Sequence, residues 1–259
     1  METIAGNLYD YPKYYDLVYG SDWQAERDFL IACFDKYASG KVRRAFEPAC
    51  GTGRLLYRLA KKGFKVSGLD LNPHAVDFCN RRLRRHGFPA SAVVGDMTQF
   101  RLRSKIDAAF NTINSFRHLT DETQAQAHLE CVADAVRPGG LYVLGLHLTP
   151  TRGEPMDEES WAARRGHLSV LSRLRVSRRD LRRREERVDM TLDVYTPTRQ
   201  FRIRDEIVFR TYTARQFLAL LERVPAWRIA ALHDFGYDAQ RSVRISQQTE
   251  DVVFVLQKQ

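Results

Sequence analysis

Several signatures that would narrow the function are absent from this 259-residue sequence. No run approaches the roughly 18 apolar residues of a membrane-spanning helix, so we expect no membrane partner. Residues 1–6 have neither a basic start nor an apolar core, and we expect no secretory signal peptide. The cysteines stand far apart, without a Cys-x-x-Cys pair, at Cys33, Cys50, Cys79 and Cys131. Their spacing predicts free thiols in a cytoplasmic protein without a bound metal.

The chain also lacks the phosphate-binding motif Gly-x-x-x-x-Gly-Lys-Ser/Thr, which argues against a nucleoside triphosphate ligand. It does contain a glycine turn, Glu-Pro-Ala-Cys-Gly-Thr-Gly-Arg at 47–54, between an apolar run and a helical pattern. A strand, a glycine turn and a helix N-terminus in that order direct free backbone N–H groups at a ligand. A dinucleotide fingerprint needs a third glycine three residues after Gly53, where this chain has Leu56, so a nicotinamide cofactor is not favoured.

Residues 41–150 alternate between short strands and helical patterns. The strands are expected at 42–46, 64–70, 90–97, 106–111 and 141–146. This alternation predicts a parallel sheet with right-handed crossovers. Two further strands are expected near the end of the chain, at 227–235 and 251–256.

The pattern changes on either side of this core. Apolar residues alternate in 166–177, 187–195 and 201–210, which predicts an antiparallel meander of about three strands after Pro150. The N-terminal 40 residues are rich in tyrosine and show a helical pattern. Ser21, with Gln24 three residues later, is spaced as a capping box that opens one of these helices.

Acidic and amide residues follow the predicted strands. In an open α/β sheet the ligand lies beyond the carboxyl ends of the strands. Those ends carry the glycine turn, Asp70, Asp96 and a polar loop over 111–118. Carboxylates at this edge suit a ligand with ribose hydroxyls, an adenine and a positively charged group.

Over roughly residues 40–148 these features resemble the class I S-adenosylmethionine-dependent methyltransferases. The resemblance implies an α/β fold with a Rossmann-like, doubly wound, mostly parallel sheet of seven strands, into which the last two predicted strands fit. It implies an N-terminal helical lid at 1–40 and a cofactor-binding domain at 41–150 and 211–259. The antiparallel β insertion after the fifth strand, 151–210, would lie over the substrate pocket.

The resemblance also implies which residues contact the cofactor, S-adenosyl-L-methionine. One group would surround its methionine end: Glu47, Ala49, Gly51, Gly53, Arg54 and, from the lid, Tyr14. A second group would hold the nucleoside: Asp70, Leu71, Asn72, Asp96 and Met97. Asp70 would bind the ribose diol and Asp96 the adenine amine, while Asn111 would border the methyl group. Ala49 departs from the family, in which many members have glycine or another small residue at this position.

Methyl transfer from a sulfonium is an in-line displacement that releases S-adenosylhomocysteine, and alignment alone supplies much of its acceleration. Four side chains are candidate catalytic groups: His118, His147, Tyr14 and Tyr19. We expect the acceptor to be a nitrogen or oxygen nucleophile of a small molecule.

Two other functions remain open. The net charge of +9 and the arginine-rich stretch 164–187 suggest an RNA or DNA methyltransferase. Against it, the loop after the fourth strand reads Asn-Thr-Ile-Asn and lacks the Asn/Asp-Pro-Pro-Tyr/Phe motif of amino-methylating enzymes. A non-catalytic protein that binds S-adenosylmethionine is the third reading, because Asp70 and Asp96 report on cofactor binding and not on turnover. The sequence leaves the oligomeric state open.

Overall fold

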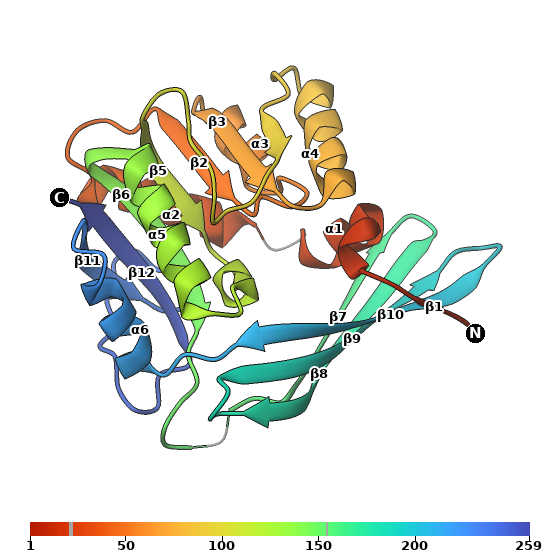
Figure 1. Cartoon of the computed structure of the whole chain (residues 1–259). Coiled ribbons are helices and arrows are strands. Elements are labelled where there is room, and N and C mark those ends of the chain that lie inside the picture. Colours follow the sequence, from red (N-terminus) through yellow and green to blue (C-terminus); the bar gives the residue numbers. More distant parts are fainter. Residues whose placement is uncertain (21–22, 154) are drawn as a thin grey trace.

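The computed structural model describes residues 1–20, 23–153 and 155–259, and these residues contain two β-sheets (Figure 1). The predicted helix cap at Ser21 lies outside the described residues. Within the part of the chain that is described, no helix is long and apolar enough to cross a membrane.

The larger sheet has seven strands in the order β11-β12-β6-β5-β2-β3-β4. Its strands are β2 (Arg44–Pro48), β3 (Lys65–Asp70), β4 (Ala92–Val94), β5 (Ile106–Asn111), β6 (Val136–His147), β11 (Trp227–His233) and β12 (Asp251–Lys258). The five strands from β2 to β6 run parallel, while β12 runs antiparallel to both β6 and β11. The α/β class predicted from the alternation is confirmed, and the sheet is mixed because β12 runs antiparallel to its two neighbours.

Helices cover both faces of this sheet because its strands are apolar on both sides. One face packs against α2 (Gln24–Tyr37), α3 (Leu56–Lys61) and α4 (Pro73–Arg85). The other packs against α5 (Glu122–Ala135) and α6 (Ala214–Glu222). Alternation within β2 shows the principle, since Phe46 lies in one core and Ala45 in the other.

The second sheet has five strands in the order β1-β10-β9-β8-β7. They are β1 (Glu2–Ala5), β7 (Glu158–Arg165), β8 (Leu168–Asp180), β9 (Glu185–Tyr195) and β10 (Gln200–Arg210). The meander β8-β9-β10 was predicted, but β7 and β1 were not. Strand β7 has charged residues on both of its faces, and strand β1 is only four residues long. Neither strand therefore shows a clear apolar alternation in the sequence. The segment expected to be a purely helical lid thus begins with a strand that pairs with β10.

The N-terminal segment that was predicted to form a lid packs against both sheets. After a short 3₁₀ turn, η1 (Leu8–Asp10), comes α1 (Pro12–Tyr19). Leu17 and Val18 pack on the inner face of the second sheet, in a core that includes Val170, Leu192 and Ile203. Figure 1 shows α1 between this sheet and α4.

Candidate active site

The glycine turn and Asp70 are joined directly at the carboxyl ends of β2 and β3. The Gly51 N–H donates to one carboxylate oxygen of Asp70 at 2.8 Å, and the Asn72 N–H donates to the other at 2.8 Å. Gly51 and Gly53 have φ values of 50° and 66°, the left-handed region that glycine tolerates best. A side chain at Gly53 would also collide with Cys79, because a Cβ there would lie 2.2 Å from the Cys79 Sγ. Asp70 is thus held in place by backbone donors, and each oxygen retains a lone pair for a ligand hydroxyl.

Two buried side chains beside this turn lack a partner for one oxygen. Glu47 is 7% exposed and its Oε2 has no hydrogen bond, and Asn111 is 3% exposed and its Oδ1 has none. The Asn111 amide donates to the Pro48 carbonyl at 2.8 Å, which fixes its orientation. Burial raises the pKa of Glu47 well above its usual range. Such buried acceptors normally have a partner, so they fit a ligand that brings ammonium or hydroxyl donors, and space above Gly51 is open to it.

The residues predicted to hold the nucleoside lie along the same edge. Leu71 is 67% exposed, as expected for an apolar side chain that would lie against a base. Asn72 caps α4 by accepting from the N–H groups of His74 and Ala75. Asp96 is exposed, and Thr98 occupies only its Oδ1. Their contacts with the cofactor stay predictions.

The remaining predicted site residues, Ala49, Arg54 and Met97, have structural roles of their own. Ala49 adopts φ 54°, the left-handed conformation in which glycine is commoner. Both terminal nitrogens of Arg54 bond to the carboxylate of Glu26 on α2, one of them at 2.8 Å. Met97 is buried at 7% exposure, and its carbonyl bonds to His128. Arg54 therefore joins α2 to the glycine turn, and its contact with the cofactor stays a prediction.

A second contact ties α1 to the turn. The Thr52 hydroxyl donates to Asp16 at 2.9 Å. Arg82 of α4 forms an ion pair with the other oxygen of Asp16 and donates to the Thr52 carbonyl at 3.1 Å. The N-terminal helices α1 and α2 are thereby joined to the glycine turn by two buried acids, Asp16 and Glu26.

The tyrosines of α1 divide between two faces of the helix. Tyr14 packs edge-on against Phe201 of the second sheet, with ring centroids 5.6 Å apart. Tyr15 and Tyr19 lie on another face with centroids 4.6 Å apart, and burial raises the pKa of the Tyr15 hydroxyl to about 12. Sequence reasoning did not single out Tyr15, although its i, i+4 spacing from Tyr19 places the two side by side.

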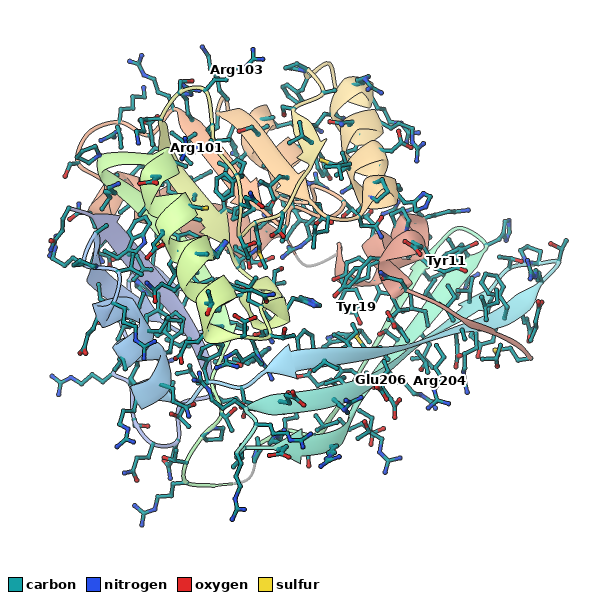
Figure 2. The ribbon with its side chains drawn as sticks, viewed as in Figure 1. Tyr11, Tyr19, Arg101, Arg103, Arg204 and Glu206 are labelled. Carbon is teal, nitrogen blue, oxygen red and sulfur yellow. The ribbon has the colours of Figure 1, made fainter. Side chains whose placement is uncertain are left out.

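Tyr19 links α1 to the second sheet. Its hydroxyl is 2.6 Å from the Ser172 hydroxyl, and its ring meets Trp161 edge-on with centroids 5.5 Å apart. Figure 2 shows Tyr19 in the space between α1 and that sheet. Burial raises the pKa of Tyr19, so its hydroxyl remains protonated and is a poor base.

His118 lies in η2 (Ser115–His118), the turn that follows β5. Its Nε2 is 3.0 Å from the Tyr9 hydroxyl, and its ring packs against Tyr9 and Phe209. Burial lowers the pKa of His118 to about 4. The imidazole is therefore neutral at physiological pH and suits a hydrogen-bonding role.

His147 lies at the end of β6, where its Nδ1 bonds to the carboxylate of Asp251. The His147 N–H donates to Asn114 at 2.8 Å, and no described residue bonds to its Nε2. Sequence reasoning missed Asp251. The sequence pattern could have indicated it. Because β12 runs antiparallel to β6, the first residue of β12, Asp251, pairs with the last residue of β6, His147.

Two histidines with lowered pKa values, His118 and His128, predict an acid-sensitive fold. Burial lowers the pKa values of His118 and His128 from 6.5 to about 4. As the pH falls, the unfolded chain takes up these protons first, so stability that is complete above pH 6.5 is lost as the pH approaches 4. Each pKa unit corresponds to ~1.4 kcal/mol, so we expect a loss of about 3 kcal/mol per histidine. Urea unfolding as a function of pH measures this loss.

Three His→Gln variants test whether His118 and His128 cause the acid-dependent loss of stability. His118→Gln and His128→Gln should each remove about half of the acid-dependent loss. His167→Gln changes an exposed histidine in the β7–β8 turn and should leave the loss intact. An equal pH dependence in all three variants and the wild type would contradict the assignment.

Many arginines of the second sheet are neutralised by acids. On the face away from α1, Arg187 pairs with Glu206 at 2.7 Å and Arg204 with Asp189 at 3.3 Å (Figure 2). A hollow on this face contains Glu158 and Asp189 among its four arginines.

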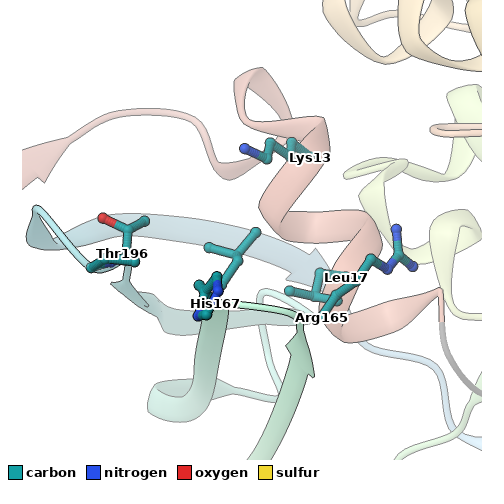
Figure 3. A pocket seen from close by; sticks show the side chains of 7 residues that line it. Lys13, Leu17, Arg165, His167 and Thr196 are labelled. Atoms are coloured by element: carbon teal, nitrogen blue, oxygen red, sulfur yellow. The ribbon is translucent and has the colours of Figure 1, made fainter.

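A second hollow lies beside α1, away from the strand ends, and includes Lys13, Arg165 and His167. In Figure 3, Lys13 and Arg165 point in different directions. Neither hollow forms a uniform basic surface of the kind that a nucleic acid backbone favours.

Comparison with known proteins finds a domain and several structures that this chain resembles. Residues 45–140 match a family model described as a methyltransferase domain. A dTDP-3-amino-3,6-dideoxy-alpha-D-glucopyranose N,N-dimethyltransferase from Streptomyces fradiae is 32% identical over 151 residues, 55% of this chain and 56% of that protein. A dTDP-3-amino-3,4,6-trideoxy-alpha-D-glucopyranose N,N-dimethyltransferase from Streptomyces venezuelae is 29% identical over 138 residues, 52% and 56% of the two chains. The chain spans little more than half the length of these curated relatives.

Solved structures share the whole fold. A methyltransferase from Clostridium acetobutylicum has a TM-score of 0.78 at 16% identity, covering 97% of this chain and 99% of that one. Streptomyces venezuelae DesVI has a TM-score of 0.75 at 19% identity, covering 94% and 95%. CalS10, an amino pentose methyltransferase from Micromonospora echinaspora solved with S-adenosylmethionine, has a TM-score of 0.71 at 21% identity, covering 96% and 98%. At these identities the likeness establishes the fold.

Proposed function

We propose that this chain, which carries a class I S-adenosylmethionine-dependent methyltransferase domain at residues 45–140, transfers a methyl group to an amine nitrogen of a small molecule. The main support for this proposal is the site at the carboxyl ends of the strands. There Asp70 accepts a hydrogen bond from the glycine turn, next to the side-chain oxygens of Glu47 and Asn111 that have no hydrogen-bond partner. The choice of nitrogen is supported by the two Streptomyces relatives, both named as N,N-dimethyltransferases of dTDP-amino sugars.

The residues of the site fit S-adenosylmethionine, the cofactor of this domain. Asp70 would accept the ribose hydroxyls, and Asp96 has Oδ2 available for the adenine amine. Glu47 and Asn111 would accept from the ammonium of the methionine end. When bound, the sulfonium supplies an electrophilic methyl group, and the chain's task is then to align the acceptor and to receive its proton.

An amine attacks only through its lone pair, so an ammonium substrate must first lose a proton. His147 is the candidate acceptor of that proton, because Asp251 engages Nδ1 and leaves Nε2 available. His118, neutral and bonded to Tyr9, would orient the acceptor by a hydrogen bond. Tyr19 would line the acceptor space between α1 and the second sheet, whereas Tyr14, packed on Phe201, would support the lid.

The test is a pair of acceptors that differ in one atom. We expect a dTDP-linked 3-amino-3,6-dideoxyhexose to release S-adenosylhomocysteine in the presence of the protein and S-adenosylmethionine, and its 3-hydroxy counterpart not to do so. His147→Asn should lower the rate about 100-fold, the usual contribution of a general base. Chromatography of the reaction measures S-adenosylhomocysteine directly.

Other outcomes would point elsewhere. Transfer to the hydroxyl counterpart alone would replace nitrogen by oxygen as the nucleophile. Transfer to RNA or DNA without transfer to any small amine would support the polymer alternative. Tight binding of S-adenosylhomocysteine with no transfer to any acceptor would leave a non-catalytic binding protein.

A further inference from the structure

Arg117 extends from η2, next to His118, into the second sheet. Its Nη2 lies 2.5 Å from the Glu186 carboxylate, and its Nε donates to the Arg210 carbonyl at 3.0 Å. Arg117 and Glu186 are both 6% exposed. This is a buried ion pair between the turn that carries the candidate imidazole and strands β9 and β10.

The second oxygen of Glu186 is also occupied. Arg179 of β8 donates to it at 2.6 Å, and Arg179 in turn bonds to Asp157 at 2.8 Å. Burial alone would raise the pKa of Glu186, but the charges of Arg117 and Arg179 outweigh it and lower the value. Glu186 therefore remains an anion that joins β8 and β9 to η2.

Phe209 of β10 connects this ion pair to the imidazole. The Arg117 guanidinium lies 5.0 Å from the Phe209 ring centroid, and the His118 ring meets the same phenyl edge-on at 4.8 Å. Tyr9 contacts His118 through its hydroxyl. Consecutive residues of η2 are thus held by the second sheet and the N-terminal segment, outside the methyltransferase domain.

The other end of η2 is held by the large sheet. The Asn114 N–H donates to the Gly145 carbonyl at 3.2 Å, and its side chain accepts from the His147 N–H. Asn114 has φ 57°, a left-handed conformation that asparagine tolerates. The turn is therefore fixed at its first residues by β6 and at its last by β9 and β10.

A buried ion pair is weak evidence for added stability, because desolvation offsets the attraction and an apolar pair of similar volume often does as well. The directional hydrogen bonds of the Arg117–Glu186 pair do fix the position of η2 relative to the second sheet. We propose that Glu186 is a positioning residue that, through Arg117, holds the His118 ring in the acceptor site. The inference rests on the proposed function for the importance of His118, but the placement itself can be tested without any acceptor.

The experiment follows the His118 imidazole by nitrogen-15 NMR in the full chain, with its signals assigned from a His118→Gln sample. In the wild type we expect one neutral tautomer, because the Tyr9 hydroxyl bonds to Nε2, and a titration midpoint near pH 4, because burial and then the charge of Arg117 lower the pKa of His118 to about 4. In Glu186→Ala we expect mixed tautomers and a midpoint raised above about 5, because a released ring reaches water. Glu185→Gln, which changes the neighbouring carboxylate without a described partner, should match the wild type.

The NMR result for Glu186→Ala decides whether Glu186 positions the His118 ring. An unchanged or lower midpoint with a single tautomer would show that the ring stays in place without Glu186, and would overturn it. If Glu186→Ala does not fold, Glu186→Gln serves instead, since its amide retains one acceptor, and a partial shift of the same sign is expected. Binding of S-adenosylhomocysteine should be unchanged in both variants, because Glu186 does not touch the glycine turn. Failure of methyl transfer in the wild type would overturn the proposed function but leave this NMR result standing.

Discussion

Replacing Asp70 with alanine should weaken the binding of S-adenosylhomocysteine by about 100-fold. Its two oxygens hold the N–H groups of Gly51 and Asn72, so the substitution removes both the ribose acceptor and the bonds that shape the glycine turn. Hydrogen bonds to a charged group contribute ~1.5–3 kcal/mol each, and ~1.4 kcal/mol corresponds to a tenfold change in affinity. Isothermal titration calorimetry at neutral pH measures the change.

The matched control is Asp77→Ala. Asp77 is an exposed carboxylate on α4 whose partner is Arg81, four residues later. Its removal should leave the affinity for S-adenosylhomocysteine unchanged. Equal affinities for the wild type and Asp70→Ala would remove the main support for the assigned cofactor site.

Replacing Arg54 with alanine should lower the free energy of unfolding by about 3–5 kcal/mol. Glu26, its bidentate partner, is 1% exposed and would be left as a buried charge without a counterion. The same substitution would loosen α2 from the glycine turn. Urea unfolding followed by circular dichroism measures the loss.

Two comparisons separate the buried charge from other effects. The double variant Arg54→Met, Glu26→Leu should recover most of the stability, because no buried charge remains. Arg81→Ala, which breaks an exposed pair, should cost no more than about 0.5 kcal/mol. A loss of similar size in Arg81→Ala and Arg54→Ala would contradict the argument.

The parts of the structure governed by local patterning could be predicted from the sequence. Alternating strand and helix patterns predicted the α/β class, and the glycine turn and the acids were correctly expected to meet at the carboxyl ends of the strands. Asp70 shows why: its position at the end of β3 follows from the strand pattern, and parallel strands align such ends. That this edge binds the cofactor stays a prediction.

What depended on long-range pairing could not be predicted in the same way. β7 was missed because both faces carry polar residues, and β1 because four residues give too little pattern. The partner of Arg54 is Glu26, and nothing in either local segment indicates that they meet. Asp251 was within reach, because the antiparallel return of β12 determines its place beside His147.

The arginine-rich stretch 164–187 shows how composition alone can mislead. Its charge suggested a polymer substrate, yet Arg179, Arg184 and Arg187 all have acidic partners in the fold. Arginines neutralised within the protein contribute less to the binding of a phosphate backbone. These pairs neutralise part of the local positive charge of the stretch, which weakens the argument for a nucleic acid substrate.

The most direct test of the account is carbon-13 NMR of a reaction that contains the protein, an amino sugar nucleotide and S-adenosylmethionine labelled in its methyl carbon. The chemical shift of the labelled carbon distinguishes a sulfonium methyl from an N-methyl and an O-methyl group in one spectrum. We predict that the sulfonium signal declines as an N-methyl signal grows, and that Asp70→Ala suppresses this change. A sulfonium signal that persists for every amine offered, or a label that appears on oxygen or on nucleic acid, would contradict the account.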